Sequence, residues 1–340
     1  MNILKIFLIF LFIYCHTLND VEADNTAINN NTLTIYTYDS FVSRWGPGKA
    51  ISEGFEQFCK CNIRWVTVVD AAAIINRLTL EGSNTKADVV IGLDHNIISN
   101  IDVDKYFSVH DLKQEDMQFD GMPLLMDTSM FVPYDWGHLA FIYNKKTFTG
   151  SLLSFEDLLA PGLKVAIQNP RSSSPGLGLV LWVKKVYGEH TTEFWRKLSP
   201  NILKVSQGWS EAYGLFLEGE ADVVLSYTTS PAYHIINEDM YDYDAAIFRE
   251  GHYLHIEVMA RSLHSKKKKL ADKFMLYMLS DNVQDLLPVT NWMYPVTKTD
   301  KGIDETFNRL NVPDKVLFMT ADEVAEVKRE VIQEWDSAIR

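Results

Sequence analysis

The sequence predicts an α/β protein with two lobes and a ligand cleft between them. Apolar, β-rich runs alternate with amphipathic segments over residues 33–93, and the same alternation returns over residues 163–237. Two further apolar stretches, residues 137–144 and 251–261, are expected to join the lobes. Alternating strands and helices are typical of open parallel sheets, which bind ligands at the carboxyl ends of their strands.

The first block predicts the elements of the first lobe. Each predicted strand is followed by an aspartate, and the second helix ends at a glycine. The run 87–93 is apolar on both faces, which is typical of a buried parallel strand. In chain order the elements are strand 33–38, helix 51–59, strand 62–69, helix 71–82 and strand 87–93.

The second block predicts the second lobe, and the chain then returns to the first. One helix has Pro175 at its first position and Gly188 at its end, as helices prefer. The predicted elements are strand 163–168, helix 175–188, helix 211–219, strand 221–227, helix 231–237 and the C-terminal helices 266–280 and 320–338. The predicted division is residues 33–136 for lobe one, 137–255 for lobe two, and 256–340 for the return to lobe one with the C-terminal helices.

Composition limits the function. The chain has 340 residues, of which 47% are hydrophobic and 23% charged, and its formal net charge is −13. That charge excludes sequence-independent nucleic-acid binding through a broad basic surface, and it is compatible with a small cationic ligand.

The N-terminus predicts an exported protein. An apolar run follows Lys5, and small residues precede a cleavage site after Ala23, so residues 1–23 resemble a secretory signal peptide. The alternative is an uncleaved membrane anchor, which needs about 20 apolar residues, more than this run offers. Residues 24–32 are polar and are expected to form a disordered lead-in.

Aromatic, hydroxyl and carboxylate side chains gather directly after the predicted strands. Such a set suits a flat cationic heteroaromatic ligand, because aromatic faces attract cations and a carboxylate supplies the counter-charge. Ser174-Pro175 and Ser230-Pro231 each suggest a helix N-cap followed by proline. Two helix N-termini at one cleft would form an anion site, fit for a hydroxyl or phosphate tail. Asp70 has an alternative role as the cap of the helix that begins at Ala71.

Catalytic and metal-binding patterns are weak. The histidines lack the spacing of metal ligands, and the sequence shows no motif of a Ser-His-Asp catalytic triad. Cys59 and Cys61 are too close in sequence for an easy loop disulfide, and we expect them to be free, strained or exposed to metal.

Several long motifs carry a resemblance to a known family. They include TIYTYDSF (34–41), KADVVIGLD (86–94), QNPRSSSPGLGL (168–179), GWSEAYGLFLEGE (208–220), VLSYTTSPAYHI (224–235), EGHYLHIEV (250–258) and NWMYPV (291–296). With these motifs the chain resembles the bacterial periplasmic thiamine-binding proteins, the solute-binding components of thiamine ABC importers. The resemblance runs from about residue 33 to the C-terminus.

The resemblance implies a fold, a ligand and a partner. The fold is the two-lobe type II periplasmic-binding-protein fold, and the ligand is thiamine or its phosphates, with no cofactor and no catalysis. The partner is the membrane permease of an ABC importer, the compartment is the periplasm, and the expected state is a monomer.

The resemblance also implies roles for individual residues. Asp70, beside Ala71, would contact the charged or aminopyrimidine part of the ligand, and Trp209 would pack on it. Ala71 and Ser174 stand where the family has Gly and Thr, which are small changes. The remaining roles are ring framing by Tyr38, Trp45, Tyr233 and Trp292, a polar strip from Ser173 and Ser174, and a second helix start lined by Tyr227, Thr228, Thr229 and Ser230.

Two other functions compete with this interpretation. A thiamine-degrading enzyme on the same fold needs a cysteine nucleophile in the cleft, whereas Cys59 and Cys61 are placed at the end of a lobe-one helix. A binder of another cation, such as a polyamine or ferric ion, is the second alternative. Tyr227 lies where an iron-binding set could begin, but the aromatic framing suits an organic ring better.

Overall fold

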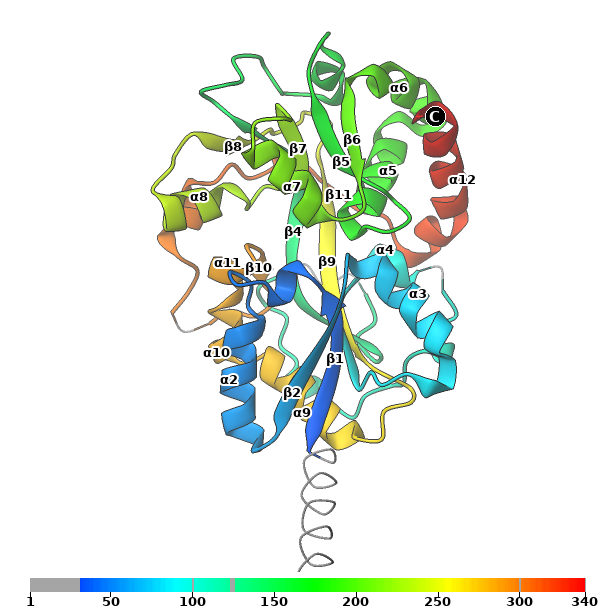
Figure 1. The fold of residues 1–340 in the computed structure, drawn as a ribbon, viewed down its shortest axis with the longest axis vertical. Coiled ribbons are helices and arrows are strands. Elements are labelled where there is room, and N and C mark those ends of the chain that lie inside the picture. The colour runs from blue at the N-terminus through cyan, green and yellow to red at the C-terminus, as the bar shows by residue number, and fades with distance from the viewer. Residues whose placement is uncertain (1–30, 100, 123–125, 300, 340) are drawn as a thin grey trace, which may run out of the picture.

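The structure is a computed structural model that describes residues 31–99, 101–122, 126–299 and 301–339. The predicted signal peptide and most of the predicted lead-in lie outside the described residues. Within them, one mixed sheet of eleven strands runs through both lobes, with helices flanking it (Figure 1). The main strand order is β2-β1-β3-β9-β4-β7-β5-β6, with β8 and β10 paired to β4 and β11 paired to β9.

The bounds of the elements are as follows. The strands are β1 (Thr32–Tyr38), β2 (Asn62–Val68), β3 (Val89–Asp94), β4 (Phe131–Asn144), β5 (Val165–Gln168), β6 (Ile202–Ser206), β7 (Val223–Tyr227), β8 (Tyr243–Ala245), β9 (His252–Arg261), β10 (Tyr294–Pro295) and β11 (Val316–Leu317). The helices are α2 (Gly48–Cys59), α3 (Ala71–Glu81), α4 (His95–Ile98), α5 (Ser174–Tyr187), α6 (Thr191–Leu198), α7 (Trp209–Leu217), α8 (Pro231–Glu238), α9 (Lys268–Met278), α10 (Asp281–Gln284), α11 (Leu287–Thr290) and α12 (Ala321–Ile339).

The first lobe follows the predicted alternation. β1 lies between β2 and β3 and runs parallel to both. Helix α2 buries Ile51 and Phe55, and α3 buries Ile74 and Leu78, so each helix covers the sheet with residues four apart on one face. The five elements predicted over residues 33–93 are confirmed, with ends within three residues of the prediction.

The second lobe repeats this parallel arrangement. β5 pairs parallel with β6 and β7, and α5 and α7 are its crossover helices. The strands and helices predicted over residues 163–237 are confirmed, with ends within two residues. Helix α6 is not among the predicted elements, because it is short and its charged residues weaken the apolar pattern. Its buried residues include Phe194, Trp195 and Leu198.

Two long antiparallel strands connect the lobes. β4 pairs with β9 along one part of its length and with β7 along another, while β9 also pairs with β3. Figure 1 shows both strands passing from the lower lobe to the upper one. The apolar stretches predicted to join the lobes, residues 137–144 and 251–261, lie in these two strands.

The C-terminal helix contacts both lobes, since Lys328 of α12 donates to the carbonyls of Asn96 and Ile97 in α4, but most of its contacts are with the second lobe. α12 packs on α5 and α6 of the second lobe, as Figure 1 shows. Its buried residues include Val324, Val331 and Trp335. On the facing helix, the Lys184 ammonium lies 2.7 Å from the carboxylate of Glu330. The apolar stripe predicts the helix, but it does not specify which lobe that stripe covers.

The expectation for the cysteines is wrong. Cys59 and Cys61 form a disulfide with their Cα atoms 5.2 Å apart, within the ordinary range for such bonds. Lys60, between them, has a left-handed backbone conformation with φ of 56°, which ends α2 and turns the chain sharply. None of the described helices combines the length and the apolar character that a membrane span requires.

Candidate ligand-binding site

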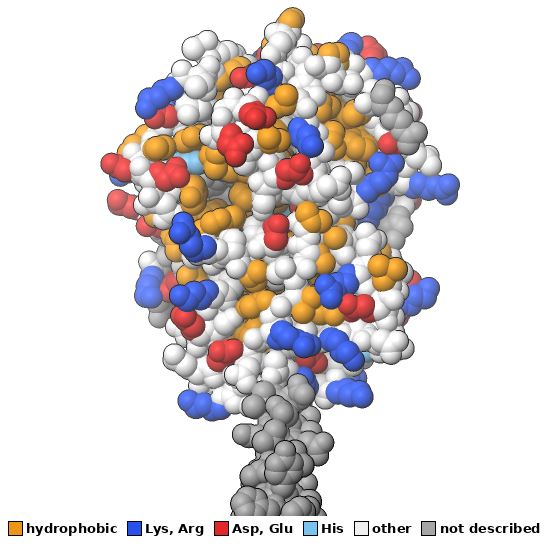
Figure 2. Space-filling view, viewed as in Figure 1, with side chains coloured by type: hydrophobic (Ala, Val, Ile, Leu, Met, Phe, Trp, Pro, Cys, Tyr) orange, Lys and Arg blue, Asp and Glu red, His pale blue; other side chains and the backbone are white. Residues whose placement is uncertain are grey.

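A cavity of about 290 Å³ lies between the lobes, at the carboxyl ends of several strands. Residues from both lobes line it, and Trp45, Val69 and Leu217 expose part of their apolar surface there. Figure 2 shows hydrophobic side chains around the middle of this face of the molecule. Nine of the thirteen predicted site residues line the cavity: Tyr38, Trp45, Asp70, Ser174, Trp209, Tyr227, Ser230, Tyr233 and Trp292.

The other four predicted residues lie behind the cavity wall. The Ala71 backbone N–H donates to Asp70 Oδ1 at 2.6 Å, and the Ser173 hydroxyl also hydrogen-bonds to Asp70. Thr228 and Thr229 are buried, and neither hydroxyl has a hydrogen-bond partner. Ala71 and Ser173 therefore position Asp70, whereas Thr228 and Thr229 do not line the cavity.

One of the two predicted helix caps is shifted by one residue. Ser173, not Ser174, caps α5, since its hydroxyl accepts the Gly176 N–H. The Ser174 hydroxyl instead donates to Asp94 across the cleft. Ser230 stands at the N-cap position of α8 with Pro231 after it, as predicted, but its hydroxyl accepts the N–H of Tyr227 at 3.2 Å and makes no capping hydrogen bond to the helix.

Aromatic rings form two groups in the cavity wall. Trp209 stacks on Tyr213 with ring centroids 4.8 Å apart and meets Trp45 of the other lobe edge-on at 5.9 Å. Its indole N–H donates to Ser226, which fixes the ring. The second group is Tyr233 and Trp292, whose rings are perpendicular with centroids 5.2 Å apart. The two groups present apolar faces suited to a flat ring system.

The Asp70 carboxylate ties the two lobes together. It follows β2 in the first lobe and caps α3, so the alternative role considered for it is confirmed. Its oxygens also accept the backbone N–H groups of Ser174 and Trp209, each at 3.1 Å, from the first turns of α5 and α7. Burial raises the pKa of Asp70 to about 6, although these hydrogen bonds oppose the shift.

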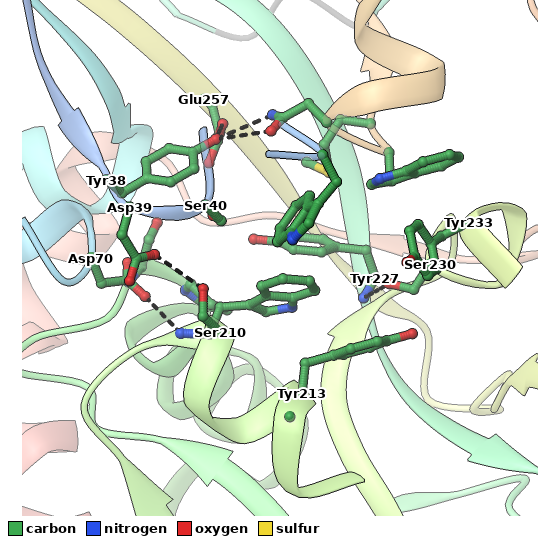
Figure 3. Close-up of a pocket in the computed structure, with 18 of the residues that line it drawn as sticks. Tyr38, Asp39, Ser40, Asp70, Ser210, Tyr213, Tyr227, Ser230, Tyr233 and Glu257 are labelled. Carbon is green, nitrogen blue, oxygen red and sulfur yellow. Dashed lines mark hydrogen bonds between the residues drawn. The ribbon is translucent and has the colours of Figure 1, made fainter. Parts of the chain in front are cut away.

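A second contact between the lobes lies nearby. The Ser210 hydroxyl of α7 donates to Asp39 Oδ1 at 3.0 Å (Figure 3). Burial raises the pKa of Asp39 as well. The cleft is thus crossed by carboxylates of the first lobe that accept hydrogen bonds from helix starts of the second.

A third acid, Glu257, lines the cavity from β9. Its Oε2 accepts the Tyr38 hydroxyl at 2.9 Å and the hydroxyl of Tyr134. The Tyr38 hydroxyl also accepts a side-chain N–H of Asn291 at 3.1 Å. The residues that line the cavity include three carboxylates, Asp39, Asp70 and Glu257, and no lysine, arginine or histidine. The cavity is therefore both aromatic and negative.

Several lining residues are absent from the predicted set, chiefly Asp39, Glu257, Tyr213 and Asn291. Asp39 follows the predicted strand 33–38, and Asn291 lies in a loop toward the C-terminus. Glu257 had a different signal, an acid in the middle of an apolar strand whose ten residues are all buried. Such a residue needs a partner or a proton, and this marks it as a candidate. The described residues contain no group of three His, Cys, Asp or Glu side chains able to hold a metal ion.

Comparison with known proteins gives consistent results. Residues 44–285 match the family of bacterial extracellular solute-binding proteins. The chain is 45% identical over 309 residues to the thiamine-binding periplasmic protein of Salmonella typhimurium, covering 90% of this chain and 93% of that protein. It is 43% identical to the Escherichia coli thiamine-binding periplasmic protein, again over 90% of this chain and 93% of that one.

Solved structures agree with this result. A periplasmic thiamin binding protein has a TM-score of 0.86 and 43% identity, covering 91% of this chain and 96% of that chain. A ferric binding protein from Campylobacter jejuni has the same fold, with a TM-score of 0.72 and 19% identity, covering 90% of this chain and 99% of that one. The predicted two-lobe fold is confirmed by these likenesses.

Proposed function

Because the chain belongs to the family of bacterial extracellular solute-binding proteins, we propose that it captures thiamine and delivers it to a membrane importer. It is a binding protein and not an enzyme, as its family and its relatives indicate. The observation that carries the choice of ligand is the cavity itself, which combines two groups of aromatic rings with three carboxylates and no basic side chain. Thiamine has two flat rings and a permanent positive charge, so it matches this lining.

The aromatic groups hold the rings in this proposal. Trp209 and Trp45 form one wall, and Tyr233 and Trp292 form the other. A cation over such a ring gains about 0.5–2 kcal/mol, more when water is excluded. The lobes separate to admit the ligand and then close on it through the contacts of Asp70 and Asp39.

We extend the ligand range to the thiamine phosphates on the basis of the helix starts. The N–H groups of Ala71, Ser174 and Trp209 converge on one carboxylate, that of Asp70. Helix N-termini bind anions, and here Asp70 occupies the anion position. A phosphate on the ligand competes with Asp70 for these donors, so binding of the phosphates requires Asp70 to move or to take up a proton.

The remaining context is also a proposal. The relatives are periplasmic proteins, so we place this chain in the periplasm, exported by the predicted signal peptide and delivering to an ABC permease as a monomer.

The two alternative functions, a thiamine-degrading enzyme and a binder of another cation, lose their support. Cys59 and Cys61 are joined in a disulfide, so neither offers a thiolate for thiamine cleavage. For the iron alternative, the described residues contain no group of three His, Cys, Asp or Glu side chains that could hold a metal ion, and the aromatic framing suits an organic ring better.

Titration calorimetry of the mature chain, residues 24–340, tests the proposal. The protein is first refolded from denaturant to remove any bound ligand. We expect one-to-one binding of thiamine, binding of both phosphates, and a monomer by light scattering. A folded sample that binds none of these compounds contradicts the proposed function.

A further inference from the structure

Three buried acids lie side by side on the central strands. Glu257 on β9 is the register partner of Asp94 on β3 and also of Asp135 on β4. Side chains opposed in this way lie about 4.5–5.5 Å apart at Cβ, and like charges there repel. The exposed fractions are 0% for Asp94, 6% for Glu257 and 0% for Asp135. Three negative charges in such a row require hydrogen-bond donors or protons.

Hydrogen-bond donors surround the carboxylate of Asp94. Its carboxylate accepts the backbone N–H groups of Asn96 at 2.6 Å and Ile97 at 3.1 Å, and also the hydroxyl of Ser174. Glu257 is also supplied, because Oε2 accepts the hydroxyls of Tyr38 and Tyr134. Both groups can therefore carry a negative charge.

Only one of the two carboxylate oxygens of Asp135 has a hydrogen-bond donor. Its Oδ2 accepts the Asn291 amide at 2.6 Å, whereas its buried Oδ1 has no hydrogen-bond partner. Burial and the negative charge of Glu257 raise the pKa of Asp135 well above its ordinary value. A proton on Asp135 removes one charge from the row and gives the group a donor for Glu257.

We propose that Asp135 and Glu257 share one proton and hold a single negative charge on Glu257, which binds the amino-bearing edge of the ligand's aminopyrimidine. Glu257 lines the cavity and Asp135 does not, so the charge is presented on the cavity side of the pair. An exocyclic amine donates N–H groups, and a carboxylate accepts them with a charge-assisted bond. This inference rests on the proposed function, since it assigns a role within the same cavity.

The surroundings of Glu257 leave room for a positive ligand. The titratable groups around it are Tyr38 on β1, Asp94 on β3, Tyr134 and Asp135 on β4, Tyr227 on β7 and His255 on β9. Burial lowers the pKa of His255, which keeps that ring neutral. Burial raises the pKa of Glu257 to about 7. A cationic ligand favours the ionised form, so binding near neutral pH releases protons and affinity falls as the pH drops below 7.

The main test compares two ligands in two proteins. The ligands are thiamine and the analogue in which oxygen replaces the exocyclic amino group of the pyrimidine. We expect wild type to prefer thiamine at least about tenfold, because a carboxylate repels the oxygen of the analogue. Glu257→Gln keeps the size of the side chain and removes its charge. This substitution should weaken thiamine binding at least about tenfold, and the variant should lose most of the preference for thiamine over the oxygen analogue.

Glu81→Gln is the matched control. Glu81 also accepts a tyrosine hydroxyl, that of Tyr36 at 2.7 Å, but it does not line the cavity. Calorimetry in buffers of different ionisation enthalpy counts the protons released on binding. Glu257→Gln should abolish the release seen near pH 7, and Glu81→Gln should retain it.

Asp135→Asn gives an independent readout if Glu257→Gln does not fold. An asparagine can donate to Glu257 but has no proton to share, so the fall in affinity should move to lower pH. Infrared spectra of the ligand-free protein at pH 8, where Asp70 and Glu257 are mostly ionised because their pKa values are about 6 and about 7, should contain a protonated-carboxyl band that Asp135→Asn loses and Glu81→Gln keeps.

The outcomes separate the two proposals. Wild type that binds thiamine, with Glu257→Gln unchanged in affinity and preference, overturns this inference and leaves the proposed function intact. A wild-type protein that binds neither ligand contradicts the proposed function and the recognition role together. In that case the infrared band still tests whether Asp135 and Glu257 share a proton. Persistence of the band in Asp135→Asn overturns the shared proton.

Discussion

The carboxylate of Asp70 in the first lobe accepts the backbone N–H of Trp209 in the second lobe, with the oxygen and nitrogen 3.1 Å apart. The same carboxylate accepts the N–H of Ser174, at the start of another helix of the second lobe. One side chain of the first lobe therefore holds two helix starts across the cleft. A change at Asp70 should affect closure of the lobes and binding together.

We expect Asp70→Asn to weaken thiamine binding by roughly tenfold, because the amide carries no charge and its NH₂ group cannot accept the N–H groups that meet there. The phosphates should lose less affinity than thiamine, since their phosphate no longer competes with a carboxylate for these donors. Calorimetry with thiamine and its monophosphate measures both effects, and circular dichroism checks the fold. An unchanged thiamine affinity would remove Asp70 from the site.

The second prediction concerns the aromatic pair. Tyr233 and Trp292 meet at right angles, and Trp292 has an unusual positive φ of 59° and is 7% exposed. Replacing either ring with alanine should weaken thiamine binding by about 1 kcal/mol or more through lost stacking and cation–π contact. Tyr233→Phe keeps the ring and is the control. Wild-type dissociation constants in both alanine variants would show that these rings do not frame the ligand.

Much of the fold could be predicted from local patterns. The strands of both lobes are apolar runs that end at aspartates or turns, and these signals do not depend on the rest of the chain. The side of α12 could not be predicted, because its stripe of Val324, Val331 and Trp335 fits any apolar surface. The disulfide of Cys59 and Cys61 depends on the backbone of the single residue between them.

The site was predictable where its residues follow strands directly. Asp70 lies just after β2, Tyr227 is the last residue of β7 and Trp209 begins α7 three residues after β6, and all three line the cavity. Glu257 lies within a strand, where an acid in an apolar run is a signal of its own, but its pairing with Asp135 depends on the register of β4 and β9. Register between strands far apart in sequence depends on the tertiary arrangement, which a single sequence does not specify.

The third prediction separates stability from binding. Trp335 is 5% exposed and packs with the core from α12, outside the cavity lining. Trp335→Ala should lower the free energy of unfolding by about 3 kcal/mol or more, as expected for a truncated core aromatic. The thiamine dissociation constant at 10 °C should stay within about twofold of wild type. Urea unfolding and calorimetry measure the two quantities, and a large loss of affinity in a folded sample would link α12 to the cleft.

The fourth prediction concerns the disulfide. Cys59 ends α2, and neither cysteine is among the residues that line the cavity. Replacing both Cys59 and Cys61 with serine should lower the free energy of unfolding by about 1–2 kcal/mol, because the bond closes a very short loop. Thiamine affinity should not change. Intact mass before and after reduction and alkylation checks the bond, and alkylation of the unreduced protein at either cysteine would contradict it.

The last prediction is the pH dependence of closure in the ligand-free protein. Burial raises the pKa of Asp70 to about 6 from 3.8 when the lobes are in contact. Separation of the lobes exposes the group and returns its pKa toward the lower value. The closed form therefore binds a proton more tightly, and closure is favoured as the pH falls from 7 to 5, by up to about tenfold per pH unit below 6. Small-angle X-ray scattering should give a smaller radius of gyration at pH 5 than at pH 7, and Asp70→Asn should remove most of the difference. An equal or larger radius at pH 5 in the wild-type protein would show that Asp70 does not control closure.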